Sequence, residues 1–200
     1  MAQKPSLKHL LQFTGLLSQL RLITRVVLTN GEKRWENDVE HSYMLAMTAW
    51  YLRDALHIRL NREKLLMYAL IHDFVEVYAG DTYLYSKDLV HKESKKKREA
   101  QAAWRLKKRF PEFRDLHQAI HIYEKHADRE SKFIYALDKL QPILNIYLDK
   151  GRTWKKKGVT LEMLIEQKTS KIKISPEVTG YYEAMLAHLK KNKRTLFSYS

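Results

Sequence analysis

Apolar residues recur along most of this chain at steps of three and four, which is the spacing of one face of an α-helix. The alternating pattern that is typical of strands is short and scarce. Only six glycines and four prolines interrupt 200 residues, so the pattern predicts an all-α fold. We expect helices at residues 6–28, 38–57, 61–74, 92–109, 112–126, 129–149, 160–169 and 177–191.

Local signals support several of these boundaries. Asn37 stands three residues before Glu40, which is the spacing of a capping box. Ser175 can cap the last long helix, and Pro176 has the backbone angle of a first helical residue. Gly151 is a suitable stop for the helix before it.

The length of the chain favours one domain over residues 1–200, because 44% hydrophobic content supplies one substantial core. We expect the chemistry-bearing core at about 20–151, C-terminal helices at 160–191 and a tail at 192–200 that frays. The segments between helices are the expected rim of a site. They are residues 29–37, 79–91 and 150–159.

The chain contains no cysteine, which excludes disulfides, thiolate metal sites and a cysteine nucleophile. Polar residues interrupt the first 22 positions, and no apolar stretch reaches about 18 residues. We therefore expect no signal peptide and no membrane association, with the cytoplasm as the default location.

Three helical segments carry side chains that can bind a metal. These side chains are His41, His72, Asp73 and Asp138. Imidazole nitrogens with carboxylate oxygens suit Mn, Fe, Co, Ni or Zn better than Ca. Four protein ligands leave room for a water molecule, which such an ion can activate to attack phosphorus.

Each of these residues also has an ordinary structural explanation. His41 shares a helix face with Leu45 and Leu52, as a core histidine with satisfied hydrogen bonds would. A His-Asp pair is common by chance, and Asp138 can cap a helix or form a salt bridge with Lys139. The pattern alone leaves these alternatives open.

In combination and in order, three longer runs resemble the HD-domain hydrolases, specifically the branch that contains bacterial 5′-deoxynucleotidases. The runs are Arg34–Ser42, His72–Asp81 and Leu137–Pro142, and the resemblance extends from about Leu20 to Gly151. It implies a helical bundle in which His41, His72, Asp73 and Asp138 hold one divalent cation. The ion is Mn, Co, Zn, Fe or Ni, with Mg as a further candidate.

The same resemblance assigns roles to residues around the ion. It implies that Glu76 orients or deprotonates the attacking water, that Arg25 meets the substrate phosphate and that Asp81 contacts the sugar. On the residues alone, Glu76 can equally be a surface or capping carboxylate. Asp81 can equally be a turn former after Gly80.

One position departs from the family pattern. Those deoxynucleotidases carry tryptophan directly after the phosphate-binding arginine, whereas this chain has Val26. The preference for deoxyribose over ribose is therefore open. Arg34 and Trp35 are candidates for a replacement cation and a stacking surface, although Trp35 is equally suited to ordinary packing.

The formal charge of +14 indicates an anionic partner without specifying which one. Much of the excess lies in residues 92–109 and 190–194. The basic helix predicted at 92–109 is either a solvated face, a rim that attracts phosphate or a contact for nucleic acid. No established nucleic-acid-binding motif accompanies it.

Two functions follow from these observations. The favoured one is a phosphomonoester hydrolase that converts nucleoside 5′-monophosphates, deoxy in particular, to nucleoside and phosphate. Within the enzyme class, nucleoside triphosphates or other phosphoesters are alternative substrates. The competing function is a nucleic-acid-binding or regulatory protein on an HD scaffold.

The resemblance also implies a homodimer. The face of the C-terminal helix that carries Tyr181, Met185 and Leu189 can bind the second copy, or can equally belong to the core.

Overall fold

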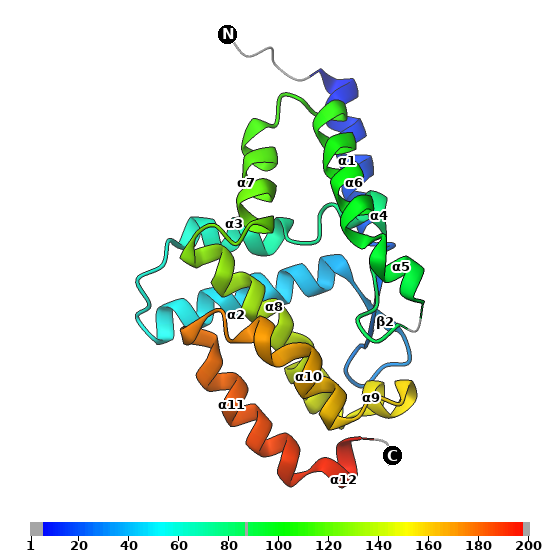
Figure 1. Cartoon of the computed structure of the whole chain (residues 1–200). Coiled ribbons are helices and arrows are strands. Elements are labelled where there is room, and N and C mark those ends of the chain that lie inside the picture. Colours follow the sequence, from blue (N-terminus) through cyan, green and yellow to red (C-terminus); the bar gives the residue numbers. More distant parts are fainter. Residues whose placement is uncertain (1–5, 87, 198–200) are drawn as a thin grey trace.

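The computed structural model of this chain describes residues 6–86 and 88–197 and consists mainly of helices, as the apolar pattern predicts. Figure 1 shows their arrangement. The helices are α1 Leu7–Leu20, α2 Asp38–Ala55, α3 Arg62–Ile71, α4 Glu76–Ala79, α5 Leu89–Glu93, α6 Lys95–Arg109, α7 Arg114–Glu124, α8 Arg129–Leu148, α9 Arg152–Lys157, α10 Leu161–Ile172, α11 Pro176–Lys191 and α12 Lys193–Leu196.

Helix α8 lies at the centre of the bundle and contacts α2, α3, α10 and α11 (Figure 1). Side chains around its whole circumference are fully buried, among them Phe133, Ile134 and Leu137. A helix that is covered on every side carries any polar residue of its middle turns into the interior. Asp138 is therefore buried by the same packing that builds the core.

A second, smaller core lies between α1, α4, α6 and α7, and α1, α6 and α7 extend to the upper side of Figure 1. Aromatic rings dominate it. Phe13 packs edge-to-face against Phe110 with ring centroids 5.3 Å apart. Phe74 and Val75 are buried in this core, and their packing holds the turn after α3 in place.

The single helix predicted at 6–28 is wrong in its second half. Helix α1 ends at Leu20, and Thr24–Leu28 forms strand β1, which pairs antiparallel with β2 Trp35–Asn37. The β-branched Thr24, Val26 and Val27 favour an extended backbone once a partner strand is present. The hairpin runs directly into α2, so it brings β1 beside the start of that helix.

Other boundaries also differ from the expected ones. The helix expected at 61–74 ends at Ile71, so the His-Asp pair follows it. The segment expected as a loop at 150–159 contains α9. No helix in the described part of the chain is long and apolar enough to cross a membrane.

The C-terminal tail was expected to fray from residue 192, and for residues 192–197 this is wrong. Helix α12 forms there, and Leu196 and Phe197 are buried. The Phe197 ring stacks on Trp154 with centroids 4.6 Å apart. Apolar burial against α9 therefore orders a segment whose own pattern is not periodic. Residues 198–200 of the predicted tail lie outside the described residues.

The apolar face of the C-terminal helix belongs mostly to the core. Tyr182 and Leu189 are fully buried, whereas Tyr181 is 42% exposed. Of the two interpretations of this face, internal packing is the one that the structure favours.

Gly151 allows the tail to pass close to the turn between α8 and α9. Its φ is +72°, and a Cβ there would lie 2.1 Å from the carbonyl oxygen of Leu196. We expect Gly151→Ala to lower the free energy of unfolding by at least about 1 kcal/mol more than Gly158→Ala does. Gly158 is a matched control because its φ is +62° but nothing lies within 4 Å of a Cβ. Urea denaturation measures both losses, and equal losses would contradict the close approach.

Candidate active site

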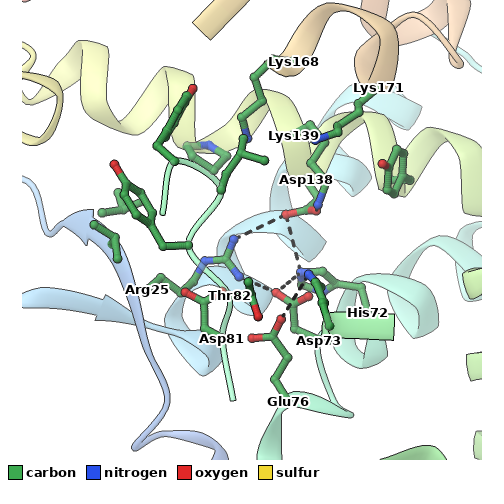
Figure 2. Close-up of a pocket in the computed structure, with 18 of the residues that line it drawn as sticks. Arg25, His72, Asp73, Glu76, Asp81, Thr82, Asp138, Lys139, Lys168 and Lys171 are labelled. Atoms are coloured by element: carbon green, nitrogen blue, oxygen red, sulfur yellow. Dashed lines mark hydrogen bonds and ion pairs between the residues drawn. The ribbon is translucent and has the colours of Figure 1, made fainter. Parts of the chain in front are cut away.

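The described residues enclose a cavity of about 670 Å³ between β1, the turn after α3, the segment 81–85, and helices α6, α8 and α10. Figure 2 shows the side chains that point into it. Its polar lining includes Arg25, His72, Asp73, Glu76, Asp81, Asp138, Lys139 and Lys168. A cavity of this size, with a few converging polar groups, is typical of a small-molecule site.

The four predicted metal ligands meet at the base of this cavity. One nitrogen or oxygen of each of His41, His72, Asp73 and Asp138 lies within 4.8 Å of all the others. His41 Nε2 is 2.9 Å from Asp138 Oδ1, and His72 Nε2 is 3.0 Å from Asp73 Oδ2. Residues from three helical segments, 97 positions apart at the extremes, thus form one cluster.

The local fold explains how adjacent His72 and Asp73 can both reach the cluster. On a continuous helix they would point about 100° apart. Because α3 ends at Ile71, the chain turns through residues 72–75 and places both side chains toward Asp138. The apolar pattern did not predict the end of α3 at Ile71, and this end allows both side chains to reach the cluster.

The hydrogen bonds of His72 leave one nitrogen ready for a cation. Its Nδ1 donates to the carbonyl oxygen of Ala69 at 2.9 Å, so Nε2 carries the free lone pair of the neutral ring. This Nε2 is buried and makes no well-aligned hydrogen bond among the described residues, and it faces Asp73 Oδ2 at 3.0 Å. A histidine that binds a metal through one nitrogen typically donates its other N–H in this way, so the donor set fits a transition metal.

The charges of the cluster also favour a cation. Burial acts to raise the pKa of Asp73, but His72 and Arg25 outweigh it and hold that pKa well below its usual value. In the same way Lys139 and His41 outweigh burial at Asp138 and lower its pKa. Both carboxylates are therefore ionised at neutral pH, as metal ligands must be.

Arg25 lies where these carboxylates converge. Its guanidinium forms ion pairs with Asp73, with Asp38 at 3.5 Å, with Asp138 at 3.7 Å and with Glu36 at 3.8 Å. Although burial opposes its charge, these neighbours raise its pKa above the ordinary value. The structure thus brings the predicted phosphate-binding cation to the predicted ligands.

Glu76 begins the short helix α4 and is buried, with only 2% of its surface exposed. Burial, followed by the charges of Asp73 and Asp81, raises the pKa of Glu76 well above its usual value. Among the described residues it forms an ion pair only with Lys95, whose Nζ lies 4.0 Å from Glu76 Oε1. The surface and capping alternatives do not fit this burial.

Asp81 lines the same cavity as predicted. It follows Gly80, whose φ of 72° turns the chain back toward the site. Burial raises the pKa of Asp81, and Arg25 opposes the effect.

Arg34 and Trp35 do not line the cavity, contrary to the role suggested for them. The guanidinium of Arg34 binds Glu32 at 2.6 Å and Glu40 at 2.8 Å on the surface. The Trp35 ring lies under the ammonium group of Lys156, 4.8 Å away. Neither residue is among those that line the cavity, whereas Val26 of the neighbouring strand β1 is.

Several charged residues of the site were not predicted, and three of them interact with the predicted ligands. Asp38 is fully buried, and burial with the charge of Asp73 raises its pKa to about 7 despite Arg25. In the sequence it looks like an acidic residue of a first helical turn, which favours helices anywhere. Lys139 binds Asp138, and Lys168 lines the cavity near both of them. Of the three, only Lys139 could have been suspected from the sequence, because it directly follows the predicted ligand Asp138.

Two arginines of the basic helix have a structural role. Arg98 donates to Thr82 Oγ1 at 2.7 Å, and Arg109 donates to the Tyr78 hydroxyl at 2.9 Å, so both hold the segment that carries Asp81. Lys95 and Lys96 line the cavity rim. The side chain of Lys92, the first residue of the predicted helix, lies outside the described ones.

Comparison with known proteins agrees with this geometry. Residues 17–179 match the HD-domain family. The 5′-deoxynucleotidase HDDC2 of Mus musculus is 34% identical over 139 residues, which cover 68% of this chain and 67% of that protein. The Homo sapiens protein of the same name is 31% identical over 68% of this chain and 66% of its own length.

A solved structure covers nearly the whole chain. It is described as a predicted metal-dependent phosphohydrolase from Magnetospirillum magnetotacticum MS-1. It superposes with a TM-score of 0.81 at 28% identity and covers 99% of this chain and 100% of that one.

Removal of one ligand should separate metal binding from the rest of the cavity. We expect His72→Ala to weaken the affinity for Mn²⁺ or Co²⁺ by at least about tenfold, because Nε2 supplies one of four bonds. His126→Ala is the control, since His126 lines the same cavity outside the cluster. Elemental analysis after dialysis against each metal measures occupancy. Equal occupancy in the two variants would contradict the assignment.

Proposed function

The chain belongs to the HD-domain family, and from this premise we propose that it is a metal-dependent phosphohydrolase that converts nucleoside 5′-monophosphates to nucleoside and phosphate. The observation that carries the proposal is the convergence of four metal-competent side chains, an arginine and a buried glutamate on one cavity. Each group has a distinct task in the attack of water on a phosphate ester.

The proposed metal ligands are His41, His72, Asp73 and Asp138. A divalent cation bound by them would supply Lewis-acid stabilisation of the phosphoryl oxygens and a lowered pKa for water. The nitrogen and oxygen donors favour Mn, Co, Zn, Fe or Ni, and Mg is the hard alternative.

Arg25 is proposed to bind the substrate phosphate. A guanidinium can donate two parallel hydrogen bonds to phosphate oxygens, and it stays charged at every relevant pH. Its contacts with Asp38 and Glu36 orient it independently of the metal ligands. It therefore neutralises the charge that grows on the phosphoryl group during attack.

Glu76 is proposed to orient the attacking water and to take its proton. Its Oε2 is buried and has no hydrogen-bond partner among the described residues, so it can accept one from a water molecule. Burial and nearby carboxylates raise its pKa, which brings the group closer to the working pH of a general base.

Asp81 is proposed to accept a hydrogen bond from the sugar 3′-hydroxyl. Val26 lines the cavity, at the position where the bacterial 5′-deoxynucleotidases that the sequence resembles carry tryptophan, and a smaller side chain restricts the sugar less. Deoxyribose and ribose substrates therefore both belong in the test.

The proposal also covers organisation and location. We propose one domain, acting as a homodimer in the cytoplasm. Four apolar residues of α2 support a dimer face, because they are exposed at four-residue steps on one side of the helix. They are Val39, Tyr43, Met47 and Tyr51.

The decisive experiment is phosphate release from deoxy- and ribonucleoside 5′-monophosphates with Mn, Co, Zn or Mg present. We expect Glu76→Gln to lower kcat at least about 100-fold, because the amide cannot accept the proton of the water. Glu124→Gln is the matched control, since Glu124 lines the same cavity away from the metal cluster. Release of no phosphate from any nucleotide with any metal would refute the proposal.

The dimer is tested separately. We expect the double variant Tyr43→Glu, Tyr51→Glu to sediment as a monomer while the parent chain sediments as a dimer, because two buried charges without partners would oppose association. Tyr181→Glu, at an exposed tyrosine of α11, is the control. A parent chain that sediments as a monomer would remove the dimer from the proposal.

A further inference from the structure

A lysine that the proposed mechanism does not use points into the cavity. Lys168 comes from α10 and is only 9% exposed. Figure 2 shows its side chain entering the cavity on the side of Arg25 and Asp138 that is opposite to Glu76. It therefore faces the end of the cavity away from the proposed attacking water.

The surroundings of Lys168 do not neutralise it. Its ammonium group forms no ion pair with any carboxylate of the described residues. Burial, together with Lys139 and Arg25, lowers its pKa to about 7, and only Asp138 opposes them among its strongest neighbours. Asp138 already binds Lys139 and lies in the metal cluster.

A buried ammonium group among other cations is unfavourable unless it loses its proton or an anion binds beside it. Two other cations of this region differ from it, because Arg25 and Lys139 each have carboxylate partners. Lys171, one turn further along α10, lines the same wall and adds to the positive potential there. This end of the cavity is therefore suited to an anionic group that the chain itself does not supply.

The cavity also has room for an organic group between its two ends. Tyr83, Tyr85 and Ile143 contribute rings and an aliphatic surface to its walls, and its volume lies within the range of ligand pockets. A nucleoside could therefore lie along these walls with anionic groups at both ends.

We propose that Lys168 is the binding residue of a second phosphate subsite, so that the cavity accepts a nucleotide with one phosphate more than the one it hydrolyses. This inference rests on the proposed function, because it places the hydrolysed phosphate at the metal cluster. The additional phosphate is either on the sugar 3′-oxygen, where it would replace the hydroxyl assigned to Asp81, or next in a 5′-diphosphate chain, where both phosphates would lie on the same side of the nucleoside. Both present anionic phosphate oxygens to the ammonium group.

Equilibrium binding of three nucleotides to the metal-free full chain tests the subsite without hydrolysis. The nucleotides are a nucleoside 5′-monophosphate, the 5′-diphosphate and the 3′,5′-bisphosphate of the same nucleoside. We expect at least one doubly phosphorylated nucleotide to bind at least tenfold more tightly than the monophosphate. Preference for the bisphosphate locates the second phosphate on the sugar, and preference for the diphosphate locates it in the chain.

Variants then assign the preference to one residue. Lys168→Met keeps the length of the side chain without its charge and should bring the affinity ratio close to one, whereas Lys168→Arg should retain it. Lys173→Met, at a partly exposed lysine just past the end of α10, should leave the ratio unchanged. Equal binding of all three nucleotides by the parent chain would overturn the inference, and so would an unchanged ratio in Lys168→Met.

The experiments distinguish a failure of the proposed function from a failure of the phosphate subsite. If no monophosphate is hydrolysed with any metal while Lys168 still sets the affinity ratio, the reaction is wrong and the subsite stands. If the monophosphate is hydrolysed but the ratio is near one, the reaction stands and the subsite is wrong.

Discussion

Four carboxylates converge on the single guanidinium of Arg25, and much of the structure depends on keeping them there. They come from the hairpin and the start of α2, from the turn after α3 and from the middle of α8. Buried like charges repel one another strongly in a medium of low dielectric constant, so they must be compensated. In a chain whose overall charge is +14, this local excess of negative charge indicates a site built to hold cations.

The same burial affects neighbouring carboxylates in opposite ways. Asp73 and Asp138 have cationic neighbours that keep them ionised, whereas Glu76 and Asp38 have raised pKa values. Groups that stay ionised suit metal binding, and a group with a raised pKa suits proton transfer. The packing of three helical segments and one strand thus gives different pKa values, and therefore different chemical roles, to side chains that all carry a carboxyl group.

The candidate metal ligands were easier to predict than the backbone that positions them. His41 and Asp138 could be found because an inward polar residue interrupts an apolar helical face. The end of α3 before His72 and the strand that carries Arg25 could not be found in this way, because both depend on partners distant in sequence. Lys168 was missed because a lysine on a short amphipathic helix looks like a surface residue until its neighbours are known.

The stacking of Phe197 on Trp154 links two regions that differ in their relation to the family. Trp154 lines the cavity and lies inside the segment that matches the HD-domain family, whereas Phe197 lies beyond its last matched residue. A cavity wall is therefore supported from behind by a part of the chain that the family does not define. Relatives could diverge in this supporting segment and so reshape the pocket while every metal ligand stays the same.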